Sequence, residues 1–134
     1  MLEELKGSET LLVADDEPVV LSLARAILAR YGYQVFLAAD GAEALRICRD
    51  KHKTIDLLLT DVIMPRMSGL ELAHCVKELN GAMRCIFMSG YDYDQIRNHG
   101  GGNLNCDYLR KPFTPEALLR KVRETLDAPK ANSN

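Results

Sequence analysis

Short apolar segments alternate along the chain with longer segments in which apolar residues recur at helical spacing. Five short segments are predicted to be β-strands because they are mostly too apolar to face water on either side. They span residues 10–14, 34–38, 55–60, 84–89 and 107–110. Strands that alternate with helices usually run parallel and are joined by right-handed crossovers. The pattern therefore predicts an α/β, doubly wound sheet of five parallel strands with five helices on its two faces.

A proline and two capping boxes mark the starts of three predicted helices. The first helix is expected at about residues 18–31, because proline suits a first helical turn and Gly32 suits a stop. The second and third are expected to begin at the capping boxes of residues 40–43 (Asp-x-x-Glu) and 68–71 (Ser-x-x-Glu). The buried stripe of the first helix is predicted to be Val20, Leu23, Ile27 and Tyr31.

The last two helices carry opposite signals. Thr114 and Pro115 favour a helix start, and the expected core positions that follow are Leu118, Val122 and Leu126. The stretch HGGGNLNC, from His99 onward, instead opposes helix, since each glycine costs about 1 kcal/mol relative to alanine. We therefore expect the fourth helix to end near His99 and residues 100–105 to be mobile. This would weaken dimerisation through the surface formed by the fourth helix, the fifth strand and the fifth helix, and would favour a monomer.

Composition and charge narrow the class of protein. A chain of 134 residues with 47% hydrophobic residues, 27% charged residues and a net charge of −2 suits one soluble domain. We expect a body of residues 10–127, an N-terminal approach segment of residues 1–9 and a disordered tail of residues 128–134. The sequence has no strongly basic stretch, no apolar run near the ~18 residues needed to span a bilayer, and no apolar core of a signal peptide near its start. These features predict a cytoplasmic domain without direct nucleic acid binding or membrane insertion.

Cysteine and histidine positions do not indicate a metal site. The sequence has neither a C-x-x-C pair nor two histidines at i, i+4 spacing. The residues concerned are Cys48, Cys75, Cys85, Cys106, His52, His74 and His99. We interpret the cysteines as small core residues or bystanders in a reducing compartment.

Polar residues stand at the carboxyl ends of four predicted strands. They are Asp15 and Asp16 after the first, Asp61 after the third, Ser89 and Gly90 after the fourth, and Lys111 and Pro112 after the fifth. In the strand order 2-1-3-4-5, these four strands are successive neighbours about 4.8 Å apart. Ligands of an open parallel sheet gather at this edge. Three carboxylates, one hydroxyl and one ammonium group would then converge.

Three carboxylates need a cation to lie together. At about 4 Å and an effective dielectric near 20, two like charges repel by roughly 4 kcal/mol. Oxygen ligands with room for water suit Mg²⁺, whereas zinc prefers histidine or cysteine. With Mg²⁺ and Lys111 in place, the edge would be suited to receive an anion beside Asp61, and Gly90 would leave space for it next to Ser89.

Taken singly, each of these residues has a plainer interpretation. Asp61 could simply end a strand, and Asp15 with Asp16 could cap the first helix. Ser89 could be a turn residue and Tyr108 a half-buried strand aromatic. It is their joint occurrence at successive strand ends that favours a site.

The segments LLVADDEP (11–18), DVIMPRMSG (61–69), FMSGY (87–91) and DYLRKPFTP (107–115) occur in this order along the chain. Together they resemble the receiver domain of two-component response regulators, over about residues 10–127. The resemblance implies the flavodoxin-like version of the doubly wound fold and a phosphorelay function.

The resemblance implies a role for each residue of the metal site. Asp61 would be the phosphoacceptor that takes a phosphoryl group from a phosphohistidine. Asp16, Asp61 and the backbone carbonyl of Ile63 would bind Mg²⁺, or Mn²⁺ in its place, and Asp15 would act through water.

The resemblance also implies phosphate-binding, switch and rate-setting residues. Lys111, Ser89 and Gly90 would contact the phosphoryl group, and Ser89 with Tyr108 would form the switch. The Lys111–Pro112 bond would be cis, against a base rate of about 5 to 6% for X-Pro bonds. The dephosphorylation-rate positions would be Ile63 and Tyr91; neither is a general base at neutral pH and both are bulky, which predicts slow loss of the phosphoryl group.

Other functions are less well supported. Phosphohydrolases with an aspartyl nucleophile typically place a general acid two residues later, where this chain has Ile63. A flavin or nucleotide site would need a Gly-rich loop after the first strand, but the loop at that place in this chain is acidic.

The expected partner is a histidine kinase or a histidine phosphotransfer domain. Three stretches, GSETLLVADDEPVV (7–20), FMSGYDYDQIRNHG (87–100) and KPFTPEALLRKVRETL (111–126), look most like receivers of hybrid sensor histidine kinases. A stand-alone response regulator is the alternative.

Overall fold

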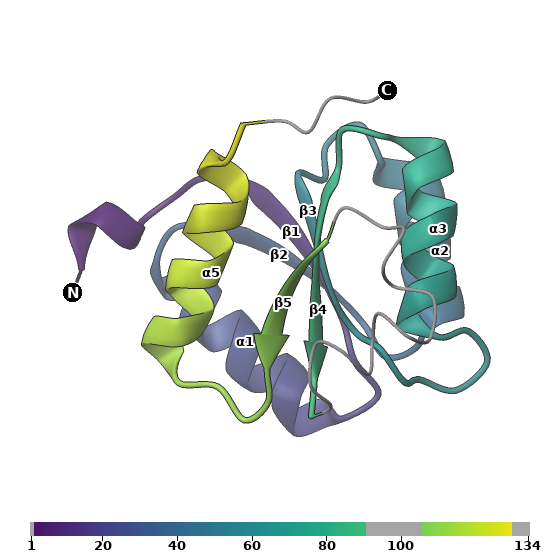
Figure 1. The fold of residues 1–134 in the computed structure, drawn as a ribbon, viewed down its shortest axis with the longest axis horizontal. Helices are drawn as coiled ribbons and strands as arrows, with labels where there is room; N and C mark the ends of the chain where they lie inside the picture. The colour runs from purple at the N-terminus through teal and green to yellow at the C-terminus, as the bar shows by residue number, and fades with distance from the viewer. Residues whose placement is uncertain (1, 91–105, 130–134) are drawn as a thin grey trace.

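The computed structural model describes residues 2–90 and 106–129, which form one sheet covered by helices (Figure 1). The strands are β1 (Thr10–Ala14), β2 (Gln34–Ala38), β3 (Leu57–Asp61), β4 (Arg84–Ser89) and β5 (Asp107–Arg110). The helices are the 3-10 turn η1 (Glu3–Leu5), α1 (Pro18–Arg30), α2 (Gly41–Lys51), α3 (Gly69–Leu79) and α5 (Pro115–Asp127). The predicted fourth helix, its end near His99 and the mobility of residues 100–105 concern a segment outside the described residues.

The sheet has the predicted topology. Its strands are parallel and follow the order β2-β1-β3-β4-β5. Four strands have the predicted bounds, but β3 begins at Leu57 instead of residue 55. Asp56 instead pairs with the start of β1: its N–H donates to the Thr10 carbonyl at 2.8 Å, and its carboxylate accepts from the Thr10 N–H at 2.9 Å. The strand extends at its other end to Asp61, beside Met88 of β4.

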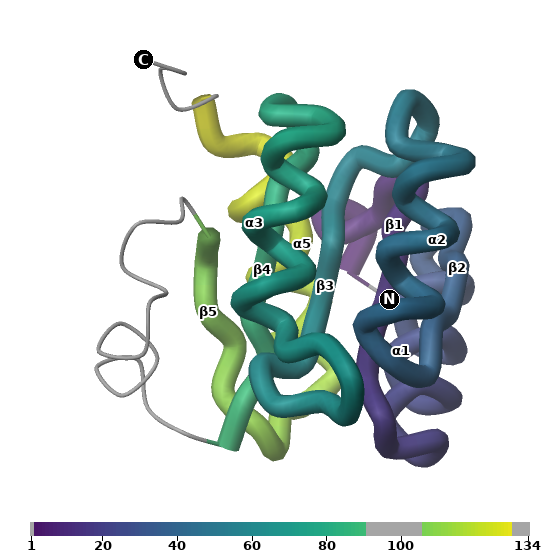
Figure 2. Tube along the Cα trace, turned by 90° about the vertical axis from the view of Figure 1, so that its right-hand side faces the viewer, coloured from purple at the N-terminus to yellow at the C-terminus, as the bar shows by residue number. Residues whose placement is uncertain are grey.

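Two hydrophobic layers bury both faces of the sheet. Helices α2 and α3 pack on one face, and α1 and α5 pack on the other (Figure 2). Along β1, Leu12 and Ala14 belong to the first layer, whereas Leu11 and Val13 belong to the second. Because both faces are covered, these strands are apolar at successive positions, which is why they could be recognised in the sequence.

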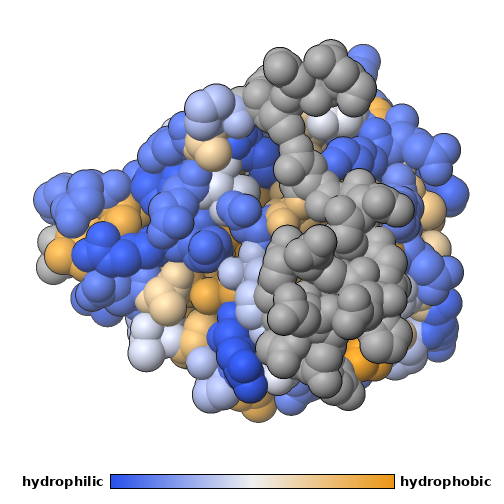
Figure 3. Space-filling model, viewed as in Figure 1, coloured by the Kyte–Doolittle hydropathy of each residue, from blue (hydrophilic) through white to orange (hydrophobic). Residues whose placement is uncertain are grey.

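The buried stripe of α1 agrees only in part with the predicted one. Val20, Ile27 and Tyr31 pack against the core as predicted. Leu23 is instead 46% exposed, and the fully buried residues are Ala24 and Leu28. Alanine lets the helix backbone approach the sheet closely, so the buried face centres on Ala24. The stripe of α5 is as predicted, with Leu118 and Val122 buried, and Figure 3 shows mainly hydrophilic residues over its outer surface.

Side-chain caps begin three helices as predicted. Asp40, Ser68 and Thr114 each accept a hydrogen bond from the backbone N–H three residues later. At Ser68 the capping box is complete, since the Glu71 carboxylate also accepts from the Ser68 N–H. In the part of the chain that the structure describes, no helix is both long and apolar enough to cross a membrane.

The N-terminal segment packs onto α5. Leu5 is buried in the layer between α1, α5 and the sheet. Arg123 of α5 donates to both carboxylate oxygens of Glu9, at 2.6 and 3.1 Å, and to the Tyr33 hydroxyl at 3.0 Å. The hydrogen bonds from Arg123 hold the pKa of Glu9 below its ordinary value. We call Arg123, Glu9 and Tyr33 the α5 staple.

Candidate functional site

Three carboxylates meet at the carboxyl edge of the sheet. Asp15 and Asp16 follow β1, and Asp61 ends β3, which is hydrogen-bonded to β1 with Ala14 beside Thr60. One carboxylate oxygen from each aspartate lies within 4.8 Å of the others. Asp15 is fully buried, the Asp61 side chain is 13% exposed, and Asp16 is exposed. The cluster is therefore open on one side and enclosed on the other.

Lys111 supplies the positive charge of this cluster. Its Nζ lies 2.7 Å from Asp15 Oδ2, 3.3 Å from Glu17 Oε1 and 3.6 Å from Asp61 Oδ2. Burial by itself lowers the pKa of Lys111, but the hydrogen bond to Asp15 and the charge of Asp61 together raise it above its ordinary value. Lys111 is therefore charged at neutral pH and is directed primarily at Asp15.

Asp61 is not fully compensated by this ammonium group. Burial, and to a smaller extent the nearby charges of Asp15 and Asp16, raise its pKa from 3.8 to about 6, although Lys111 acts in the opposite direction. A carboxylate that is destabilised in this way gains from any further cation brought near it. The site is thus short of positive charge.

The loop after β3 holds Asp61 in place. Asp61 Oδ1 accepts from the Val62 N–H at 2.9 Å, and the Gly69 N–H donates to the Val62 carbonyl at 2.7 Å. A Cβ on Gly69 would overlap the carbonyl oxygen of Asp61. The absence of a side chain at this position is what allows the start of α3 to approach the end of β3 so closely.

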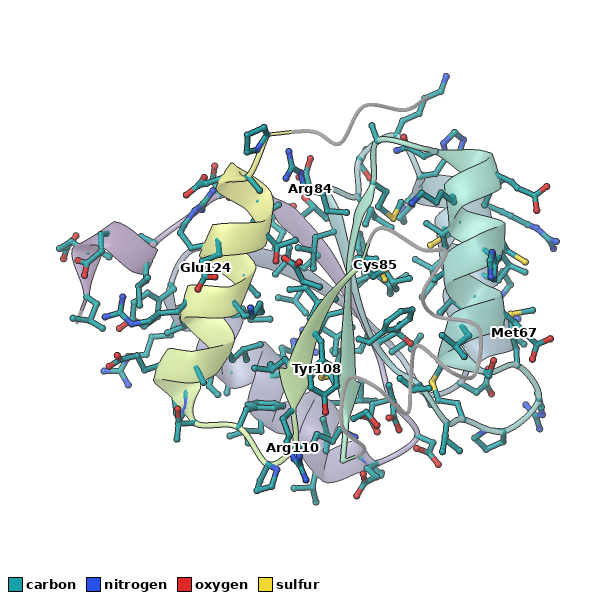
Figure 4. All side chains as sticks on the ribbon, viewed as in Figure 1. Met67, Arg84, Cys85, Tyr108, Arg110 and Glu124 are labelled. Atoms are coloured by element: carbon teal, nitrogen blue, oxygen red, sulfur yellow. The ribbon has the colours of Figure 1, made fainter. Side chains whose placement is uncertain are left out.

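The ends of β4 and β5 complete the edge. Ser89 is buried and follows Met88, the register partner of Asp61. Its carbonyl accepts from the Lys111 N–H at 2.8 Å and from the Tyr108 hydroxyl at 3.3 Å. Figure 4 shows Tyr108 on β5 beside β4. These bonds tie the position of Lys111 to that of Ser89.

Two further predictions concern backbone and space at this edge. The Lys111–Pro112 peptide bond is cis, as predicted. Among the described residues, no heavy atom lies within 4 Å of the position that a Cβ on Gly90 would occupy, so there is room beside Ser89.

Of the two predicted dephosphorylation-rate positions, the structure describes one. The Ile63 side chain is 57% exposed, and Tyr91 lies outside the described residues.

A family model for the response regulator receiver domain matches residues 11–123. The chain belongs to the receiver domain family. The match includes Asp15, Asp16, Asp61, Ser89 and Lys111, so the residues of the carboxyl edge all lie within it. The resemblance inferred from four sequence segments is therefore confirmed over residues 11–123.

Curated relatives include receivers of two kinds of protein. The domain is 34% identical over 125 residues to the sensor kinase CckA of Brucella abortus, covering 92% of this chain but 13% of that protein. It is 36% identical over 117 residues to the response regulator MprA of Mycobacterium leprae, covering 87% of this chain and 50% of that protein. The domain thus spans only a part of these relatives.

Solved structures agree with this assignment. The receiver domain of the hybrid histidine kinase CckA matches with a TM-score of 0.76 and 35% identity, over 88% of this chain and 99% of that one. A receiver domain protein from Clostridium thermocellum matches with a TM-score of 0.79 and 28% identity, over 89% and 94% of the two chains. The predicted flavodoxin-like receiver fold is confirmed.

The structure also adds residues that the sequence did not single out. Glu17 is a third carboxylate partner of Lys111 in the receiver domain, and its position in the acidic run after β1 was the available signal. Val19 is 77% exposed at the first turn of α1, which begins directly after the acidic cluster. With Leu23 and Ile63 it is one of three large apolar side chains exposed among the described residues.

Proposed function

We propose that this receiver domain takes a phosphoryl group from a phosphohistidine onto Asp61, with Mg²⁺ or Mn²⁺ bound, and changes conformation in response. The observation that carries the proposal is the environment of Asp61: a half-buried carboxylate with a raised pKa, adjacent to two further aspartates and one lysine. Because like charges repel, half-buried carboxylates with too little positive charge around them require a cation before an anionic phosphoryl group can bind next to them.

The donor set fits a hard divalent cation. The three clustered side chains offer oxygen atoms only, and Asp16 is open to solvent. Asp16 and Asp61 would hold the metal together with the Ile63 backbone carbonyl, and Asp15 would act through water. When bound, Mg²⁺ would neutralise charge on the phosphoryl oxygens.

The chemistry required of the chain itself is nucleophilic displacement. An Asp61 carboxylate oxygen attacks phosphorus, the new P–O bond forms as the P–N bond to imidazole breaks, and the histidine keeps the electron pair of that bond. Lys111 pairs with a phosphoryl oxygen, and Ser89 donates its hydroxyl to another beside the open space at Gly90. Positioning and charge stabilisation supply most of the catalysis in such transfers.

The conformational response is assigned to Ser89 and Tyr108. The Tyr108 hydroxyl donates to the Ser89 carbonyl, so a movement of Ser89 toward a phosphoryl group removes or redirects that contact. Tyr108 is half-buried against the layer beneath α3, and it can follow Ser89 by turning further inward. Residues 10–127 are proposed as the body that undergoes this change.

The proposed partner is a histidine kinase or a histidine phosphotransfer domain. Val19, Leu23 and Ile63 are exposed apolar side chains on the segments that follow the acidic cluster, and they would be covered when the phosphohistidine reaches Asp61. The similarity to the CckA receivers favours a hybrid sensor histidine kinase as the parent protein. A stand-alone response regulator is the alternative. We expect a cytoplasmic, monomeric domain without direct nucleic acid binding.

Phosphohydrolase activity is the other candidate class. The residue two positions after Asp61 is Ile63, whose exposed apolar side chain cannot protonate a leaving group. We therefore propose stoichiometric labelling without turnover of external phosphate esters.

Labelling with acetyl phosphate tests the proposal. Intact-mass analysis should show one added phosphoryl group when Mg²⁺ or Mn²⁺ is present and none with EDTA. The Asp61→Asn variant should stay unlabelled, whereas Asp50→Asn, which changes an exposed aspartate on α2, should label normally. Labelling of Asp61→Asn to the same extent as the parent would refute the assignment, and sustained release of phosphate would favour the hydrolase.

A further inference from the structure

Two thiols face each other at the end of β4 and β5 that is remote from Asp61. The register pairs Ile86 with Asp107 at the start of the strand pair and Ser89 with Arg110 at its carboxyl end. If this register is continued by one position before Ile86 and Asp107, Cys85 lies beside Cys106, and both residues pack at the same core. Figure 4 shows Cys85 near the start of β4, away from the carboxyl end of the strand at Ser89.

Their geometry suits a covalent bond. Cys85 belongs to the core between the sheet, α2 and α3, and Cys106 packs against the same core, so both side chains lie on one face. Neighbouring strands place paired Cα atoms about 4.8 Å apart, within the span of about 4.4 to 6.8 Å that a disulfide bridges. A hydrogen bond with Cys106, followed by burial, raises the pKa of Cys85 well above its ordinary value, which agrees with this placement of the two thiols.

We propose that Cys85 and Cys106 are a redox pair that forms a reversible disulfide with a low-molecular-weight disulfide as oxidant. This modification is independent of the function proposed for Asp61. It would tie the start of β5 covalently to β4 and close a loop over residues 86–105.

The order of attack follows from exposure. Cys106 is partly exposed and Cys85 is 8% exposed. The Cys106 thiolate attacks the small disulfide, which forms a mixed disulfide and releases one thiolate. Cys85 then loses its proton to solvent, and its sulfur attacks the Cys106 sulfur, which releases the second thiolate. The two protein thiols lose two electrons and two protons, and the small disulfide is reduced to two thiols.

The remaining cysteines provide the contrast. All four cysteines are free thiols, and Cys48 on α2 is fully buried. Cys75 on α3 is partly exposed, like Cys106, but it has no cysteine beside it in the strand register. Cys75 is therefore the matched control: it can react with the oxidant but is not expected to find an intramolecular partner.

Oxidised glutathione, added to the reduced full chain, tests this inference. The expected product has lost the mass of two hydrogens, and its cysteines are linked between the tryptic peptides 85–97 and 98–110. Cys75→Ser should give the same product. Cys85→Ser should instead retain one glutathione on Cys106, and Cys106→Ser should form neither the bond nor an adduct at Cys85.

Thermal unfolding provides a second measurement that does not depend on the variants. The oxidised parent should unfold at a higher temperature than the reduced parent, and reduction should reverse the difference, because the bond restricts the unfolded chain. A stable glutathione adduct on the parent without intramolecular linkage, or a linkage through Cys48 or Cys75, would overturn the inference.

Discussion

Replacing Asp61 with asparagine should stabilise the metal-free domain. The side chain is 13% exposed and its pKa is raised to about 6 from 3.8, first by burial. A carboxyl group whose pKa is raised in the folded state favours folding when protonated, and that contribution is lost as the pH rises through the folded pKa. Asparagine has nearly the same shape and remains neutral, so it avoids the loss.

The size of the effect follows from the pKa shift. Each pKa unit corresponds to about 1.4 kcal/mol, so a shift of this size gives roughly 3 kcal/mol, an upper estimate for a site open on one side. The free energy of unfolding of Asp61→Asn should equal that of the parent near pH 4. The difference in favour of the variant should grow between pH 4 and about 6 and stay constant above that range. A smaller value would indicate that solvent reaches Asp61 more freely.

Urea unfolding in EDTA at several pH values measures this difference. Asp50→Asn is the matched control, since Asp50 is exposed and should show little change at any pH. Added Mg²⁺ should stabilise the parent, by about 2.7 kcal/mol at a concentration one hundred times its dissociation constant, and leave Asp61→Asn unchanged. An Asp61→Asn variant that is less stable than the parent at pH 7.5, or equally more stable at pH 4 and pH 7.5, would refute the reasoning.

Three other perturbations test separate parts of the molecule. Replacing Ile63 with serine and Tyr91 with alanine should open the phosphoryl group to water and shorten its lifetime, measured as loss of label at fixed Mg²⁺ after donor removal; unchanged decay would contradict the shielding. Gly69→Ala should cost about 1 to 3 kcal/mol in urea unfolding because the added carbon overlaps the β3 backbone, whereas Gly81→Ala, with its nearest atom at 3.8 Å, should cost much less. Arg123→Ala should lower the free energy of unfolding by about 2 kcal/mol at pH 7. The loss should become smaller as the pH falls and Glu9, whose pKa is lowered by Arg123, becomes protonated. An equal loss at pH 3 and pH 7 would argue against the α5 staple.

Much of the fold could be predicted because the sheet is parallel and buried on both faces. Four strands were predicted at their observed bounds, and the carboxylates and the lysine at the strand ends could be grouped once the strand order was assumed. The third strand was predicted to begin two residues too early because Ile55 is buried and apolar like the strand itself, whereas Asp56 pairs with β1 through its backbone N–H and its carboxylate. Periodicity does not distinguish such a residue from the first position of a strand.

What the sequence did not reveal depends on small or distant residues. Ala24 was not counted in the α1 stripe because alanine contributes little hydrophobicity, although the helix packs around it. The contact between Glu9 and Arg123 joins residues at opposite ends of the chain, each of which looked like an ordinary surface charge. Local patterns contain no information about such a pair.

The contact between Lys111 and Asp15 joins residues 96 positions apart. During synthesis from the N-terminus, β1, β3 and β4 are complete before Lys111 has been added, so the acidic edge precedes the ammonium group that compensates it. Domains generally fold as units during synthesis, and contacts between distant residues carry the entropic cost of closing a long loop. Completion of the cluster of three aspartates and one lysine therefore coincides with docking of β5, and a chain that ends before this strand carries three mutually repelling carboxylates without their lysine.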